Sequence, residues 1–125
     1  MRILLDTHIY LWSVTEDRRL SRRARGIIEK AEEVFVSSVS VWELSIKSAR
    51  GKLEPRMQRA VDRVGQSGFA ELRVEFAHAF AVRSLPLLHH DPFDRMLVAQ
   101  AVSEVMRFLT SDKQLSHYDE CVIIA

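Results

Sequence analysis

The sequence predicts a three-layer α/β fold in which helices cover both faces of a five-stranded parallel sheet. Short, continuously apolar segments alternate with segments of helical periodicity, the pattern of strands that are buried on both faces. Several of these segments end at a carboxylate. At 125 residues, 47% hydrophobic and 28% charged, the chain is long enough to bury a core. We therefore expect a single domain spanning residues 1–125.

The five expected strands are the short apolar runs of the chain. They lie at residues 2–5, 34–36, 69–74, 107–110 and 121–124. Cys121, the single cysteine, opens the last of them and is expected to act as a small core side chain, because one cysteine cannot form an internal disulfide.

Six helices are expected around the sheet, at residues 8–14, 21–30, 38–50, 55–64, 75–83 and 92–105. Ser21 is a suitable N-cap for the second, and Ser38 or Ser40 begins the third, which Gly51 ends as a C-terminal glycine. Pro55 opens the fourth. The third and fourth together form a small helical hairpin near residues 38–67.

Four acids are placed by this reading at one edge of the sheet. Asp6 and Asp112 directly follow strands, Glu43 follows a strand after a few residues, and Asp94 opens a helix that leads into another strand. The carboxyl ends of parallel strands share one edge, where ligands of open sheets bind. Four carboxylates at that edge repel each other unless a cation lies among them, and oxygen ligands select Mg²⁺ or Mn²⁺.

Two of these acids also have a structural interpretation at a helix start. Asp91 fits an N-cap, with Pro92 at the first helical position and Asp94 in the first turn, where the helix dipole favours an acid. Ser40 and Glu43 match a capping box, in which Glu43 would reach back to the Ser40 amide.

Simple local roles compete for the other positions as well. Glu43 and Lys47 are spaced for an i,i+4 ion pair, and Asp112 suits a turn after a strand. Asp6 is the exception, because little turn chemistry surrounds an acid that ends a buried strand. It is the joint pattern of the four acids that indicates a metal site.

Other features of the sequence bound the function. His89 and His90 are adjacent and neither a His-Glu-x-x-His nor a Cys-x-x-Cys pattern occurs, which disfavours a zinc site, while His8 lies nearest the acids and stays open. Apolar runs are short and no signal peptide opens the chain, so we expect a cytoplasmic protein that does not enter a membrane.

The basic residues are mostly arginine, 14 against four lysines. A guanidinium group can bind phosphate through two hydrogen bonds at once, which makes arginine the better phosphate ligand. Setting four of the 17 acids aside in a metal site leaves 18 basic residues against 13 acidic ones, a net charge of +5 that suits a polyanionic partner. For the arginines at positions 18, 19, 22, 23 and 25, a solvated helix face is at least as good an explanation.

The sequence resembles the PIN-domain family, and most closely the VapC toxins of bacterial and archaeal toxin-antitoxin pairs. The resemblance covers nearly the whole chain in order, and its combined blocks are specific. These blocks are Leu4-Leu5-Asp6-Thr7-His8, Ser37 to Leu44 with Lys47, Gly51-Lys52-Leu53, Asp91 to Ala101 and Thr110-Ser111-Asp112.

The resemblance implies an endoribonuclease that depends on Mg²⁺ or Mn²⁺ and uses Asp6, Glu43, Asp94 and Asp112 as its catalytic acids. Asp6 and Asp94 are then the main metal ligands, and Glu43 and Asp112 bind directly or through water. Asp91 is an additional acid of this subtype and is expected to serve as the N-cap.

Four polar residues are expected to assist these acids. Thr110 or Ser111 would orient a water molecule, and Lys47 and Arg95 would hold flanking phosphates. The resemblance also implies an RNA substrate, a homodimer and a cognate antitoxin. Apolar residues that could receive the antitoxin are Trp12, Trp42, Ile46, Met57, Val61 and Val64, although such a helical stripe is more often core.

Two other classes share an acidic magnesium pocket. A haloacid-dehalogenase-like phosphatase needs a second acid two residues after the first, where this chain has His8. A receiver-like phosphoacceptor module needs an acidic pair after the first strand and a phosphoacceptor after the third, and neither is evident. Both are retained as alternatives.

Overall fold

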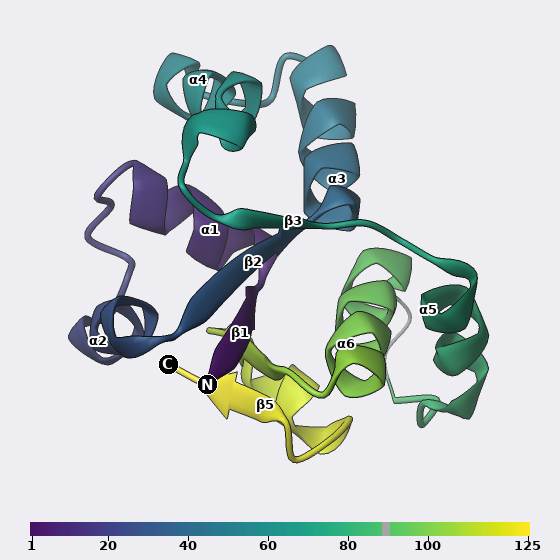
Figure 1. Cartoon of the computed structure of the whole chain (residues 1–125). Coiled ribbons are helices and arrows are strands. Elements are labelled where there is room, and N and C mark those ends of the chain that lie inside the picture. Colours follow the sequence, from purple (N-terminus) through teal and green to yellow (C-terminus); the bar gives the residue numbers. More distant parts are fainter. Residues whose placement is uncertain (89–90) are drawn as a thin grey trace.

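The computed structural model describes residues 1–88 and 91–125 and has the expected three-layer architecture around a five-stranded, all-parallel sheet (Figure 1). The strand order is β3-β2-β1-β4-β5. The strands are β1 (Arg2–Leu5), β2 (Glu33–Ser37), β3 (Ala70–Leu72), β4 (Arg107–Thr110) and β5 (Val122–Ile124). The helices are α1 (Thr7–Val14), α2 (Arg22–Lys30), α3 (Ser38–Ala49), α4 (Pro55–Asp62), α5 (Phe76–Ala81) and α6 (Pro92–Glu104).

The central strand β1 is buried on both faces, as its unbroken apolar sequence requires. Ile3 and Leu5 pack into a core with α1, α2, α3 and α4, whereas Leu4 packs into a second core with α6. Figure 1 shows α1 and α2 on one side of the sheet and α5 and α6 on the other. β1 pairs with β2 and β4, so the segments that follow these three strands meet at one edge.

Several element boundaries differ from those that the sequence predicts. β3 is shorter than the expected 69–74, and the expected helix 75–83 divides into α5 and a 3₁₀ turn at Val82–Ser84. An unpredicted 3₁₀ helix, Lys113–His117, follows β4. Gly51 lies at φ +66°, the left-handed conformation expected just after α3. His89 and His90, for which the sequence disfavours a zinc site, lie outside the described residues.

The helical hairpin is present as α3 and α4, and its apolar stripe is largely core. Met57 and Val61 are buried, whereas Trp42 is 61% exposed. Cys121 packs beside the second core as expected, and burial raises the pKa of its thiol to about 12, so it is protonated at neutral pH. Among the described helices, none has the length and apolarity to cross a membrane.

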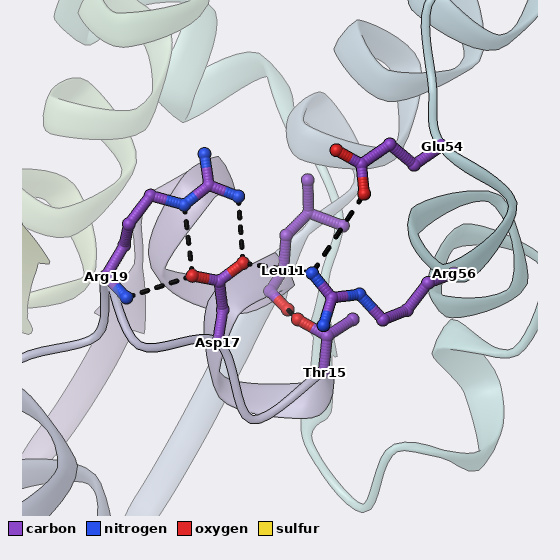
Figure 2. A network of polar contacts seen from close by, with 6 residues as sticks. All are labelled: Leu11, Thr15, Asp17, Arg19, Glu54 and Arg56. Carbon is purple, nitrogen blue, oxygen red and sulfur yellow. Dashed lines mark hydrogen bonds and ion pairs between the residues drawn. The ribbon is translucent and has the colours of Figure 1, made fainter.

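A charged contact fixes the loop after α1 to α4. The Asp17 carboxylate, only 8% exposed, accepts hydrogen bonds from the Arg19 amide at 2.9 Å and from its guanidinium at 3.0 and 2.8 Å. Arg56, in the first turn of α4, approaches the same carboxylate at 3.3 Å and Glu54 at 4.0 Å (Figure 2). Hydrogen bonding from Arg19 holds the pKa of Asp17 well below its usual range.

Replacing Asp17 by Asn is expected to lower stability at neutral pH, because the variant loses the charge that both guanidinium groups face. A carboxyl whose folded pKa is depressed contributes stability above its unfolded pKa of about 4, and that contribution is lost as pH falls toward the folded value. Urea unfolding of the wild type and Asp17→Asn should therefore differ at pH 7 and converge in acid. Equal stability at pH 7 would show that the contact contributes nothing.

Candidate active site

Asp6 lies at the end of β1, at the centre of the sheet, and its carboxylate is held from two sides. Oδ1 accepts a hydrogen bond from the Thr7 amide at 2.8 Å, and Oδ2 accepts one from the Thr110 hydroxyl at 2.6 Å. The side chain is 7% exposed. Asp6 is thus the N-cap of α1 as well as a site candidate, and the expectation that little turn chemistry surrounds it is wrong.

Burial raises the pKa of the Asp6 carboxyl, because water is removed from the charged form. The hydrogen bonds from Thr110 and Thr7 and the nearby His8 oppose this effect, while the charge of Asp112 adds to it. Folding therefore destabilises the ionised form of Asp6, and a bound cation would stabilise it.

Thr7 connects this edge of the sheet to α3. Its Oγ1 lies 2.9 Å from Glu43 Oε1 and 2.9 Å from Ser40 Oγ, and both Thr7 and Ser40 are buried. Thr7 has one hydroxyl proton and an ionised carboxylate only accepts, so Thr7 donates to Glu43 and the Ser40 hydroxyl donates to Thr7. Glu43 is therefore directed toward the Asp6 end of β1.

The competing capping-box interpretation of Glu43 is wrong. Ser37 is the N-cap of α3, and its hydroxyl accepts a hydrogen bond from the Val39 amide at 3.0 Å. Ser40 lies inside the helix. In the part of the chain that is described, no salt bridge joins Glu43 to Lys47 either, so neither local role accounts for Glu43.

Asp112 is tied to Asp6 through Thr110. The Thr110 hydroxyl donates to Asp6 and accepts from the Asp112 amide at 3.0 Å. The Asp112 carboxylate accepts from the Gln114 amide at 3.0 Å, so the predicted turn role is confirmed. The single proton of Thr110 is donated to Asp6, so Thr110 orients that carboxylate, and its role in orienting water stays a prediction. Ser111 is exposed.

Asp94 lies in the first turn of α6, behind the N-cap Asp91, as the sequence predicts. The Asp91 carboxylate accepts from the Phe93 amide at 2.8 Å and from the Asp94 amide at 3.3 Å. The starts of α3 and α6 adjoin, because the rings of Trp42 and Phe93, whose neighbours are Glu43 and Asp94, pack edge to face with centroids 4.9 Å apart.

The structure therefore links Asp6, Glu43 and Asp112 through two threonines, and it places Asp94 on the helix beside α3. Within residues 1–88 and 91–125, no three His, Cys, Asp or Glu side chains lie close enough together to hold a metal ion as they stand. Convergence of all four acids on one ion stays a prediction. The four candidate ligands fit a hard cation, because all four are carboxylates. One of them, Asp6, is buried, and burial disfavours its charged form unless a cation is bound.

The residues expected to bind phosphate are less well supported. The Arg95 guanidinium donates to the Pro86 and Val82 carbonyl oxygens and to the Tyr118 hydroxyl, at 2.8, 3.3 and 3.2 Å. These contacts favour a structural role. Lys47 lies in the last turn of α3. The arginines at positions 18, 19, 22, 23 and 25 are all exposed, as a solvated face requires.

Thr7 and Ser40 are the polar partners that the sequence did not identify. Both belong to segments that carry an acid, but only the tertiary structure shows that they face one another. His8, left open by the sequence, is exposed and its ring packs against Trp12 at 5.8 Å between centroids. It acts on Asp6 through charge, lowering the pKa of that carboxyl.

With this geometry established, the family follows from comparison with known proteins. A model of the PIN domain matches residues 3–120, and the chain belongs to that family. Ribonuclease VapC22 of Mycobacterium tuberculosis is 29% identical over 119 residues, which cover 90% of this chain and 88% of that protein.

Two solved structures show the same fold. One is VapBC2 from Rickettsia felis bound to a DNA fragment from its promoter, with a TM-score of 0.76, 16% identity, and coverage of 100% of this chain and 98% of that one. The other is FitAcB from Neisseria gonorrhoeae, with a TM-score of 0.71, 20% identity, and coverage of 98% and 96%.

Asp6→Asn is expected to leave the metal-free protein as stable as the wild type, or more stable, at pH 7. Because folding raises the pKa of Asp6, the protonated carboxyl contributes its full stability below the unfolded pKa of about 4, and this contribution is lost as pH rises through the pKa of the folded state. Asn at position 6 carries no charge at any of these pH values, so the variant does not lose stability in this way, and its side chain still caps α1.

The measurement is urea unfolding from pH 4 to pH 8 with EDTA present. The relative stability of Asp6→Asn should increase with pH. Asp62→Asn, on an exposed part of α4, is the control and should show no such trend. A large loss of stability in Asp6→Asn at pH 7 would contradict the account.

Proposed function

We propose that this protein is a metal-dependent endoribonuclease and the toxin of a toxin-antitoxin pair. The observation that carries the proposal is the linked arrangement of Asp6, Glu43 and Asp112 at the carboxyl edge of a PIN-domain sheet. The name of the M. tuberculosis relative, a ribonuclease, supports the activity. Mg²⁺ or Mn²⁺ would be the ion, and Asp6 and Asp94 its main ligands, with Glu43 and Asp112 binding directly or through water.

Asp6 and Asp94, with Glu43 and Asp112, would hold a divalent ion, which when bound would supply activation of water and charge stabilisation at the phosphate. The chain itself supplies orientation. Thr110 fixes one oxygen of Asp6 and the α1 N-terminus fixes the other, while Thr7 holds Glu43 toward the same edge. Since no side-chain or ribose nucleophile takes part, the products would carry 5′-phosphate and 3′-hydroxyl ends.

The two alternative classes are not favoured. A dehalogenase-like phosphatase needs an acid where this chain has His8, and that side chain is exposed and packs on Trp12. A receiver-like module needs an acidic pair after β1, but Asp6 is followed by Thr7 and His8. Phosphate release from a phosphomonoester, or a stable aspartyl phosphate, would favour one of these instead.

The assembly state also belongs to the proposal. A toxin-antitoxin complex from Klebsiella pneumoniae has a similar fold, with a TM-score of 0.67 and 17% identity, which supports a cognate antitoxin partner for this chain. Of the apolar candidates, Trp42 has the exposure to meet a partner, whereas Met57 and Val61 belong to the core. A single domain over residues 1–125, a homodimer and a cytoplasmic location complete the proposal.

Asp6→Asn and Asp94→Asn are each expected to reduce RNA cleavage by about a hundredfold or more, because loss of an outer-shell partner alone typically costs about 10–100-fold and these two acids are proposed to bind the ion directly. Cleavage of single-stranded RNA would be followed with Mg²⁺, Mn²⁺ or EDTA, and the product ends mapped. Asp62→Asn is the matched control and should cleave like the wild type. Full activity of either site variant, or undiminished cleavage in EDTA, would overturn the proposal.

Magnesium is expected to raise the melting temperature of the wild type, because an ion that binds only the folded state stabilises it by about 1.4 kcal/mol at ten times its Kd. For a chain of this size that corresponds to a shift of about 3–6 °C. Differential scanning fluorimetry with millimolar Mg²⁺ tests this. The shift should be smaller in Asp6→Asn, and an equal shift in both proteins would place the ion elsewhere.

A further inference from the structure

Gln100 is a polar residue buried in the core beneath α6. Its side chain is fully buried, as are those of its neighbours Ser37 and His78. A buried amide requires hydrogen-bond partners at both ends, since an unpaired polar group in the core is destabilising. The hydrogen-bond partners of Gln100 connect α6 to the segments at the ends of β2 and β3.

The strongest of these contacts reaches the end of β2. Ser37 Oγ donates to Gln100 Oε1 at 2.6 Å, while the same hydroxyl accepts from the Val39 amide as the N-cap of α3. At the other end of the side chain, Gln100 Nε2 donates to the Arg73 carbonyl oxygen at 3.3 Å, just after β3. One side chain therefore joins α6, the first turn of α3 and the segment that follows β3.

The helices joined in this way carry two of the proposed metal ligands. Glu43 is on α3, downstream of the Ser37 cap, and Asp94 is on α6, upstream of Gln100. The two helices also meet through the Trp42–Phe93 ring contact and through an apolar core that Val39 of α3 shares with α6. Ring packing resists separation, but it allows sliding, whereas a hydrogen bond between buried partners fixes register.

His78 supports Gln100 from α5. The Glu75 amide donates to His78 Nδ1 at 3.0 Å, so that nitrogen is unprotonated and Nε2–H donates to Glu104 Oε2 at 2.6 Å. Gln100 Nε2 lies 3.4 Å from the same Nδ1. The amide orientation of Gln100, with its oxygen toward Ser37, is thereby defined on both sides.

We infer that Gln100 is a positioning residue for the acidic site, which through its bond to Ser37 sets the place of Glu43 relative to Asp94. This inference rests on the proposed function. Gln100 lies in the core and touches neither RNA nor ion, so its effect is exerted through α3. Partners that orient metal ligands are typically worth about 10–100-fold in metal affinity or activity.

The test compares Gln100→Met, which keeps the shape of the side chain but removes its hydrogen bonds, with Ser37→Ala and with the double variant. Val98→Ala is the control, because Val98 is buried on the same helix but belongs to the apolar core. The first measurement is the Mg²⁺ concentration that gives half-maximal cleavage of a single-stranded RNA of mixed sequence.

Both single variants should need about tenfold more Mg²⁺ than the wild type. At saturating Mg²⁺ their maximal rate should be close to normal, and the double variant should be no worse than the worse single one. Val98→Ala should be less stable but have an unchanged Mg²⁺ requirement. If Gln100→Met and Val98→Ala behave alike, or if the two single effects multiply, Gln100 has no positioning role.

A second measurement does not depend on activity. The chain has two tryptophans, so in a Trp12→Phe background the emission of Trp42 reports the contact between α3 and α6. Gln100→Met should shift this emission and increase acrylamide quenching in the folded, ion-free protein, and Val98→Ala should do neither. Identical emission in all variants would overturn the positional link. Absence of cleavage by the wild type would overturn the proposed function instead. The emission of Trp42 would then still show whether Gln100 positions α3 against α6.

Discussion

The carboxylate of Asp6 is the constraint around which this fold is arranged. It ends the central strand, which has parallel neighbours on both sides, and it accepts hydrogen bonds from two adjacent elements. Thr110 reaches it from β4, and the Thr7 amide reaches it from α1. A charge in this position is unfavourable by itself, since burial raises its pKa. The hydrogen bonds from Thr110 and Thr7 oppose this rise in pKa, and a cation bound beside the carboxylate would oppose it further.

The threonines extend this arrangement to the other acids. Thr7 directs Glu43 from α3, and Thr110 receives the Asp112 amide, so three segments distant in sequence are coupled through two hydroxyl groups. Each hydroxyl has one proton, and in both cases that proton is given to a carboxylate. The buried amide of Gln100 extends the coupling to α6, the helix of Asp94. The groups that support the site are thus uncharged hydroxyls and an amide, and the acids are the charged groups of the site.

Much of the fold follows from local patterns in the sequence. Unbroken apolar runs identified all five strands because a parallel sheet is buried on both faces, and Ser21, Gly51, Pro55 and Asp91 marked helix ends through cap chemistry. The start of α3 at Ser38 was predicted, but the capping box at Ser40 was wrong, because serines at positions 37, 38 and 40 offer the same local signal. A tertiary contact distinguishes them: Ser37 meets Gln100, whereas Ser40 meets Thr7. The structural hydrogen bonds of Arg95 could not be predicted for the same reason, since its partners Pro86 and Tyr118 are distant from it in sequence.

We propose that the acids at the carboxyl edge of the sheet bind a divalent ion, with Asp6 and Asp94 as its main ligands. Anomalous diffraction from crystals of the wild type soaked in Mn²⁺ would locate this ion. We expect a peak in contact with the carboxylates of Asp6 and Asp94, lost in Asp6→Asn crystals treated in the same way. A peak elsewhere, or none at Asp6, would exclude Asp6 as a metal ligand.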